Sequence, residues 1–361
     1  MNINSTITKT NDFPIKHEGN IHDGKVRSVY WLNKKDSFRI GEPFEVIDSQ
    51  LGVMLISDRI SAFECIWQGE ILKGVPGKGA SLNAISQYWF KRFEEEDLAD
   101  NHLLATPHPL VWIVQRAEPV MVEAIARQYI TGSMWRAYEK NKRIFCGNEL
   151  PEGLERNQKL NELLITPTTK GILKGISGVP EEDDVDITRD QIVDNYELFG
   201  FKFVTDIARY ENLLREGFRL VSNELQRKGL IHVDEKKEFG YIKNNKGELE
   251  LIYIDEPPTP DSSRMWDAEA YERGEVLEKS KELFREILLK GVPDRDILLN
   301  KNRMLERVEL VKSYRVADKD MIRVSELYNG LAKKITGEEV PIIENAREEI
   351  IDCLVPYEII K

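Results

Sequence analysis

A lysine and two acidic residues lie where a predicted β-hairpin would bring them together. Residues 230–255 read as two strands joined by a turn at 244–247. In that register Lys236 lies opposite Asp255, and the alternation of side chains along a strand puts Glu238 on the same face. The two carboxylates are then diagonal neighbours whose backbones lie roughly 7–8 Å apart.

Two carboxylates this close repel each other unless a cation lies between them. A Mg²⁺ ion bound to phosphate oxygens would fit, since Mg²⁺ often takes one or two protein carboxylates. Lys236 would add a point charge for phosphate. The alternative is a solvated cross-strand pair of lysine and acid that contributes about 0.2–1 kcal/mol.

The stretch DEPPTPDSSRMW at 255–266 follows the second strand of this hairpin. Its three prolines fix the backbone and remove donors, so we expect a stiff segment that does not continue the sheet. Asp261 and Arg264 are thereby held near Asp255. Such rigidity is consistent with a preorganised site.

Polar residues also follow an earlier apolar strand. Asp58 and Ser61 come after VMLIS, at a position where sites often form. The alternative is an ion pair between Asp58 and Arg59, with Ser61 capping a helix.

GVPGKGAS at 74–81 is not a Walker loop, because its lysine is followed by glycine. This glycine-rich segment leads into a helix N-terminus at Ser81, which can bind an anion. The alternative is a flexible turn before the helix.

Two further segments carry basic residues. Lys25 and Arg27 share one face at the start of the strand VRSVYWL, where they meet either a phosphate or water. Arg127 lies near the end of VMVEAIARQYI, and Ser133 follows in a turn that is typical of a phosphate site or of a helix N-cap.

The absence of GxSxG, GxGxxG and kinase motifs argues against serine hydrolases, Rossmann dehydrogenases and protein kinases.

The composition is that of a globular protein. The chain has 361 residues, 41% hydrophobic and 32% charged, without an apolar run of about 18 residues or a signal peptide. Three scattered cysteines and five unpaired histidines argue against a disulfide framework, a zinc site or a histidine metal site. The net charge of −12 argues against nucleic-acid or membrane surfaces as partners. The cysteines fit a reducing cytoplasm, and the net charge leaves an anionic small substrate open, because a local cluster of Arg and Lys can reverse the sign inside a cleft.

The predicted elements fall into segregated blocks of strands and helices, which favours an α+β fold. Helical spacing begins at Ser81 and again over 207–225, where Gly229 is expected to end the helix. Residues 33–52 are expected to include a further short strand, and residues 146–190 to form a long functional loop or a linker. The chain after the hairpin is mostly helical. The predicted strands outside the hairpin are 26–32, 53–57, 112–117 and 120–130.

Eight segments, taken in order, resemble the SAICAR synthetase (phosphoribosylaminoimidazole-succinocarboxamide synthase) family over roughly residues 24–337. They are GKVRSVY, SDRISAFE, PGKGASLNAISQYWF, VEAIARQYITGS, LPEGL, ITPTTKG, VDEKKEFG and IDEPPTPDSSRMW. The resemblance implies an α+β fold, with a small antiparallel-sheet N-terminal domain over a larger mixed α/β domain and an ATP cleft between them. We expect these domains at 1–115 and 116–337, followed by a C-terminal helical extension at 338–361.

The resemblance also implies a reaction and a set of site residues. The family uses ATP and Mg²⁺ to join L-aspartate to the carboxylate of an aminoimidazole ribonucleotide (CAIR), giving SAICAR, ADP and phosphate. The residues expected to bind ATP are Lys25, Arg27, Lys236, Glu238 and Asp255. Among them, Glu238 and Asp255 are the expected metal ligands. The expected substrate residues are Asp58, Ser61, Arg127, Ser133, Asp261, Arg264 and Arg285. The expected catalytic residues are Lys236, Asp58 and Arg264.

The chain departs from the family pattern at several positions. Glu64 stands where an aspartate is usual, Lys237 where the residue is usually aromatic or aliphatic, and Met121 where proline is usual. The acidic loop EEDDVDIT lacks its usual histidine. Two other functions remain open: an ATP-dependent kinase of a small anionic substrate, and a catalytically silent nucleotide-binding relative.

Overall fold

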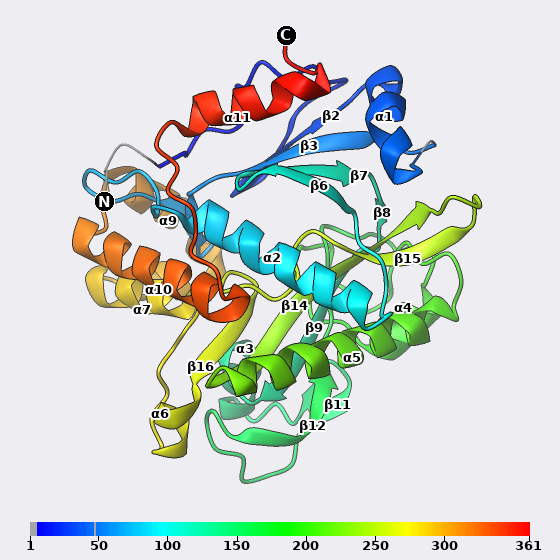
Figure 1. The fold of residues 1–361 in the computed structure, drawn as a ribbon. Coiled ribbons are helices and arrows are strands. Elements are labelled where there is room, and N and C mark those ends of the chain that lie inside the picture. The colour runs from blue at the N-terminus through cyan, green and yellow to red at the C-terminus, as the bar shows by residue number, and fades with distance from the viewer. Residues whose placement is uncertain (1–5, 47) are drawn as a thin grey trace. The chain divides into compact units, whose positions relative to one another are not determined.

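The chain folds into two compact units, and the computed structural model describes residues 6–46 and 48–361 (Figure 1). Unit 1 comprises residues 1–87, 103–116 and 279–361, and unit 2 comprises residues 88–102 and 117–278. These units differ from the expected domains, which grouped residues 279–337 with the second one. The segment packs with unit 1 because its helices bury side chains such as Phe284 and Tyr328 in the core of that unit.

Unit 1 contains a five-stranded antiparallel sheet in the order β1-β2-β3-β7-β6. The strands are β1 (His22–Asp23), β2 (Arg27–Trp31), β3 (Leu51–Ile56), β6 (Leu103–His108) and β7 (Val111–Gln115). Every residue of β3 and β7 is buried. A separate hairpin joins β4 (Ile60–Ala62) to β5 (Cys65–Trp67) through Phe63 and Glu64, both in the left-handed region. Two consecutive residues with positive φ give a two-residue turn a backbone twist that matches the right-handed twist of the strands it joins.

The helices of unit 1 come from both ends of the chain. They are α1 (Lys34–Gly41), η2 (Glu42–Phe44), the first part of α2 (Lys78–Glu95), α7 (Glu282–Gly291), α8 (Asp296–Leu299), η3 (Lys301–Arg303), α9 (Met304–Ser313), α10 (Asp318–Thr336), α11 (Ala346–Leu354) and η4 (Val355–Tyr357). Helix α10 buries Met321, Val324 and Tyr328 in the same core as the sheet. One apolar core therefore holds the N-terminal sheet and the C-terminal helices together.

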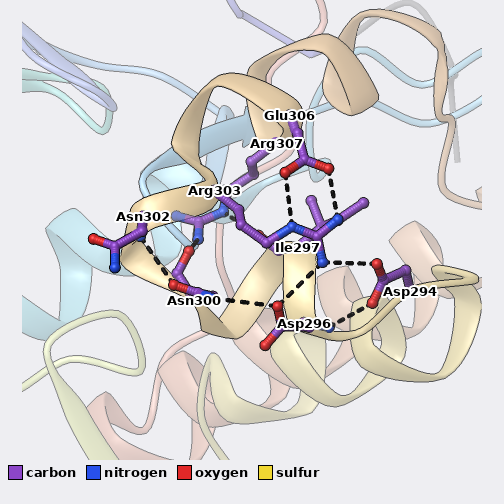
Figure 2. Close-up of polar contacts among 8 residues, drawn as sticks. All are labelled: Asp294, Asp296, Ile297, Asn300, Asn302, Arg303, Glu306 and Arg307. Atoms are coloured by element: carbon purple, nitrogen blue, oxygen red, sulfur yellow. Dashed lines mark hydrogen bonds and ion pairs between the residues drawn. The ribbon is translucent and has the colours of Figure 1, made fainter.

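Two arginines organise the turn between α8 and α9 (Figure 2). Arg303 pairs with three carboxylates at the surface, those of Asp294, Asp296 and Glu306. Arg307 is buried and donates to three backbone carbonyls, those of Ile297, Asn300 and Phe63. Because the last of these belongs to the β4–β5 turn, Arg307 holds that left-handed turn against α9.

Unit 2 contains a seven-stranded sheet whose central path is β12-β9-β14-β15, with β13 on β9 and with β8 and β16 on β14. All of its pairs are antiparallel. The strands are β8 (Glu118–Pro119), β9 (Val122–Tyr129), β12 (Lys159–Ile165), β13 (Thr168–Thr169), β14 (Leu230–Lys243), β15 (Leu249–Ile254) and β16 (Ser263–Asp267). The 14-residue strand β14 is central, because it pairs with four other strands.

Helix α5 (Asp206–Arg227) packs on β14, as Figure 1 shows. Its buried stripe includes Tyr210, Phe218 and Leu225, which confirms the predicted helix. The left-handed Gly229 lies just past its end, as expected. The other elements of unit 2 are the last part of α2 (from Tyr88), β10 (Ile144–Phe145), β11 (Asn148–Glu149), α3 (Gly132–Glu139), α4 (Arg189–Asp194) and α6 (Ala268–Glu272). No helix among the described residues has the length and apolar character needed to cross a membrane.

Three local predictions are wrong. The described residues between β2 and β3, 32–46 and 48–50, contain the helices α1 and η2 and no strand, because the Asn33 side chain caps α1 by accepting from the Asp36 amide. The predicted loop at 146–190 contains the seven-residue strand β12. The end of DEPPTPDSSRMW returns to the sheet, where Ser263–Asp267 pairs with β14 after the last proline.

Candidate functional site

The predicted hairpin is present, but its register differs by one residue. Glu238 lies opposite Ile254 and Lys243 opposite Leu249, because the connection is one residue longer than predicted. The strand then ends, and Asp255 adopts a left-handed φ of 60°. That turn brings the Asp255 carboxylate within electrostatic reach of Lys236, since it contributes to raising the pKa of this lysine. The predicted proximity therefore comes from a backbone turn rather than from strand pairing.

Lys236 is the centre of a chain of charged groups on one face of β14. Its Nζ lies 2.6 Å from Oε1 of Glu123 on β9 and 3.2 Å from Oε1 of Glu238. The Lys170 ammonium contacts the other oxygen of Glu238. Burial lowers the pKa of Lys236, but the carboxylates of Glu238 and Glu123 outweigh this effect and hold the pKa above its usual value. Lys236 therefore stays protonated.

Two members of this chain, Glu123 and Lys170, were not among the predicted site residues. Glu123 could have been found from the sequence. It lies four residues before Arg127 in the same predicted strand, and side chains alternate along a strand, so both point to one face. Lys170 follows the short strand β13, where Thr168 donates to Glu123 over 3.1 Å. Its position depends on the pairing of β13 with β9, which spacing along the sequence does not reveal.

A second cluster surrounds Asp234, which lies two residues before Lys236 on the same face. The Asp234 carboxylate accepts from Nη1 of Arg264 at 2.6 Å and from Nη1 of Arg127 at 3.2 Å. Arg127 also donates to Ser133 at 3.3 Å. Burial alone would raise the pKa of Asp234, but Arg264 and Arg127 lower it below its usual value. The structure thus brings three predicted residues together around an acid that was not predicted.

The turn at Gly132 lets Arg264 approach the backbone. Gly132 has a φ of 57°, and a Cβ there would lie 2.7 Å from Nη2 of Arg264. Helix α3 begins at this glycine, and Ser133 occupies its first turn instead of the N-cap position. Thr131 of the same turn is the N-cap of α3, without a capping bond from its side chain, and the Ser133 hydroxyl accepts from Arg127.

The proline segment is tied to β14 by its own hydrogen bonds. The Ser262 carbonyl accepts from the Lys236 amide at 3.1 Å, and the Ser262 hydroxyl bonds the Pro257 carbonyl at 3.2 Å. The amide of Asp261 donates to the Thr259 hydroxyl at 3.2 Å. These bonds fix the turn that carries Asp261 beside the strand that carries Lys236.

The predicted residues of unit 1 lie on different elements. Lys25 is exposed and pairs with Glu64 at the tip of the β4–β5 hairpin. Arg27 is buried on β2 with its guanidinium 5.9 Å from the centre of the Trp112 ring. Ser61 lies on strand β4, so it does not cap a helix. Arg285 lies on α7 and bonds Glu282 at 2.8 Å.

Asp58 lies at the N-terminus of helix α2. It is 3% exposed, and its two oxygens accept from the amides of Ile7 and Gly79, each at 2.9 Å. Arg59 turns away to Ser57 and Asp23, so the predicted alternative of an ion pair with Asp58 is wrong. The sequence predicted that the N-terminus of this helix could bind an anion. In the structure, the Asp58 carboxylate accepts the Gly79 amide there.

We predict that Asp58 makes the stability of the protein fall between about pH 4 and pH 6. Burial raises its pKa from 3.8 to about 6, although the Gly79 and Ile7 amides oppose the shift. The stabilisation from this raised pKa is present below about pH 4 and is lost as the pH rises through 6. Relative to Asp58→Asn, the wild type should lose about 2–3 kcal/mol of unfolding free energy over this range. Urea unfolding at each pH measures this, and parallel pH profiles for the two proteins would contradict it.

The chain matches known proteins over most of its length. Residues 20–296 match the sequence model of the SAICAR synthetase family. The chain is 57% identical over 348 residues to the phosphoribosylaminoimidazole-succinocarboxamide synthase of Colwellia psychrerythraea, with 95% of each protein covered. It is 56% identical over 347 residues to the synthase of Vibrio atlanticus, again with 95% of each covered.

The fold has known relatives too. The structure of the Saccharomyces cerevisiae SAICAR synthase complexed with SAICAR superposes with a TM-score of 0.65, at 24% identity, over 93% of this chain and 99% of that one. The family model and the two sequence relatives identify the same activity. The chain belongs to the SAICAR synthetase family, the ATP-dependent ligases that join L-aspartate to CAIR in purine biosynthesis.

Proposed function

We propose that the charged face of β14 holds both the nucleotide phosphates and the carboxylate that is activated in the SAICAR synthetase reaction. The observation that carries this proposal is the position of Lys236 between Glu123 and Glu238, two residues from the arginine-bound Asp234. The reaction transfers the γ-phosphoryl group to the CAIR carboxylate, after which the aspartate amine attacks the acyl phosphate. One C–N bond forms, and phosphate leaves.

Such a reaction needs positioned charge more than a protein nucleophile. Lys236 stays protonated and can neutralise oxygens of the transferred group. Lys170 lies on the other side of Glu238 and can do the same for a neighbouring phosphate. We propose that these ammonium groups turn from Glu238 to the nucleotide when it binds.

We propose Glu238 and Asp255 as the protein ligands of a Mg²⁺ ion. The donor chemistry fits, because both are carboxylates near one lysine. Among the described residues, Glu238 is bonded by the ammonium groups of Lys170 and Lys236, which phosphate could attract. The described residues hold no cluster of three or more His, Cys, Asp or Glu that could bind a metal alone. When bound, the ion would neutralise the phosphate charge that develops during transfer.

We predict that Glu238→Gln and Asp255→Asn each raise the Mg²⁺ concentration needed for half-maximal activity. The expected rise is at least about tenfold, the scale on which losing even an outer partner weakens a metal site. Activity measured across a Mg²⁺ titration tests this, with Glu248→Gln in the hairpin turn as the control. Unchanged Mg²⁺ dependence in both folded variants would exclude these ligands.

We propose Arg264, Ser133 and Asp261 as contacts of the ribonucleotide substrate. Arg127 is buried and bonded to three side chains, so its part is to position Asp234 and Ser133. In unit 1, we assign Lys25 and Arg27 to the ATP phosphates, and Ser61 and Arg285 to the substrate, as the family resemblance implies. The burial of Asp58 fits a supporting role in holding the start of α2.

An activity assay separates this proposal from the other two functions. With ATP, Mg²⁺, CAIR and L-aspartate present, we expect ADP to form in step with SAICAR. ADP formation without consumption of aspartate would favour the kinase, and no turnover would favour a silent relative. Since the substrates are soluble metabolites of purine synthesis, we also propose a cytoplasmic location.

A further inference from the structure

Unit 2 has a cavity that the SAICAR synthetase reaction does not use. It measures about 730 Å³ and is bounded by α5, α6 and strands β9, β12 and β14. None of the residues proposed above for ATP, metal or substrate is among its described lining residues. From α5 it takes a stripe at helical spacing, made of Arg215, Phe218, Arg219, Ser222, Asn223 and Gln226. This volume is in the range of small-molecule sites.

The cavity has an uneven charge distribution. Lys159, Arg215 and Arg219 line it, and Arg215 is fixed by its bond to the Leu163 carbonyl on β12 at 2.9 Å. The Arg219 guanidinium forms no hydrogen bond or ion pair with the described parts of the chain. Arg215 and Arg219 therefore place two cations about one turn apart on α5, in a protein whose net charge is −12. Lys159 lies four residues before Leu163 on β12, opposite Tyr129.

The opposite end of the cavity is acidic. Glu269 and Glu272 lie on α6, and the amide of Ala268 ties this helix to the Gly229 carbonyl just after α5. From Arg215 to Gln226 the helix rises roughly 16 Å. A ligand that spans the cavity would therefore meet the two arginines at one end and the two carboxylates at the other.

Aromatic rings form the wall between these ends. Tyr129 is 7% exposed and packs edge-on against Trp266 and Tyr271, with ring centres 5.2 and 5.6 Å away. Its hydroxyl has no hydrogen-bond partner within residues 6–46 and 48–361, although a buried tyrosine usually finds one. Tyr271 stacks on Trp266. The wall thus offers planar surface and an unused hydroxyl group.

His232 forms part of the floor and is uncharged. Burial and the nearby Lys237 ammonium lower its pKa to about 3. Its ring stacks on Phe218, with the centres 4.2 Å apart, and its Nδ1 lies 3.2 Å from the Ser222 hydroxyl. The positive charge of the cavity therefore comes from the lysine and the two arginines alone.

We propose that this cavity binds a phosphorylated small molecule with a planar ring, of the size of a mononucleotide. The phosphate would lie between Arg215 and Arg219, which lie about one turn apart on α5. The ring would lie against Tyr271, where the Tyr129 hydroxyl can bond it. Glu269 and Glu272 would accept from an amine or a sugar hydroxyl at the far end. The site is separate from the one proposed for ATP, so it can bind a ligand while the enzyme turns over.

The test uses adenosine 5′-monophosphate as the probe and isothermal titration calorimetry of the full chain. Because this probe can also enter the ATP site, the variant Arg215→Ala/Arg219→Ala measures any binding there. We expect the wild type to show an additional binding event that Arg219→Ala weakens by about 10–100-fold and Tyr129→Phe by about 2–10-fold. Arg209→Ala removes an exposed cation from α5 outside the cavity and should change nothing.

The kinetic control is that Arg219→Ala and Tyr129→Phe keep the KM for ATP and the kcat of the wild type in the absence of the probe. The proposal is overturned if all binding of the probe is lost on adding ATP and is unaffected by the cavity variants. It is also overturned if inorganic phosphate binds as tightly as the nucleotide, since the ring would then add nothing. These outcomes do not depend on the roles assigned to β14.

Discussion

Replacing Lys236 by methionine should lower kcat/KM for the ligation by about 10²–10³-fold, the effect of removing one preorganised charge-stabilising donor. Methionine keeps most of the side-chain volume but removes the ammonium that lies between Glu123 and Glu238. Two carboxylates then face the phosphates of ATP without their shared cation. Steady-state kinetics in ATP, CAIR and aspartate measure the loss.

The control for this variant is Lys246→Met, which removes an exposed lysine from the turn of the same hairpin. It should keep the activity of the wild type. Circular dichroism and urea unfolding establish that both variants are folded. A folded Lys236→Met enzyme with near-normal kcat/KM would show that the lysine is a structural partner of the two glutamates and has no part in catalysis.

Replacing Lys237 by methionine should destabilise the protein by about 3–5 kcal/mol, because it leaves a buried carboxylate without its partner. The Lys237 Nζ lies 2.7 Å from Oε1 of Glu235, and both side chains are almost fully buried behind β14. The rings of Phe93 and Tyr253 lie 4.8 and 5.5 Å from the ammonium. Solvent therefore cannot replace the lost charge.

The double variant Glu235→Met/Lys237→Met removes both charges and should recover most of the stability, since apolar residues of similar volume often replace a buried pair without loss. Burial raises the pKa of Glu235. In Lys237→Met the deficit should therefore shrink at low pH, where Glu235 is protonated, and grow as the pH rises. Urea unfolding measures all three proteins, with Lys243→Met, an exposed lysine of the same strand, as the control. Equal stability of the single variant and the wild type would contradict the prediction.

The elements predicted correctly from the sequence are those with a clear local pattern of apolar residues. The stripe on α5 and the apolar strands β3 and β7 are buried as predicted, because periodicity alone specifies their buried faces. The register of the β14–β15 hairpin was wrong by one residue, since the length of a polar connection is not fixed by such patterns. Strand β12 was missed because only Leu160 and Leu164 among its residues are buried.

The site residues that belong to family motifs could be predicted from the sequence. Residues that reach the site through the pairing of strands across the sheet were harder to predict. Lys236 and Glu238 were found, but Asp234 was missed although it has the same strand parity as both. The burial of Lys237 could not be predicted from hydropathy, which treats a lysine as exposed. Only the three-dimensional pairing with Glu235 explains it.

The ion pair behind β14 limits how related sequences can vary. Gly217 on α5 faces this pair, and a Cβ there would lie 2.5 Å from Nζ of Lys237 and 3.2 Å from the Tyr253 hydroxyl. A side chain at 217 would require the Lys237 ammonium to shift, which would lengthen its contact with Glu235, so a larger residue at 217 favours a shorter or apolar one at 237. Positions 217, 235 and 237 should therefore change together among relatives, and a chain that acquires one of these substitutions alone should be selected against.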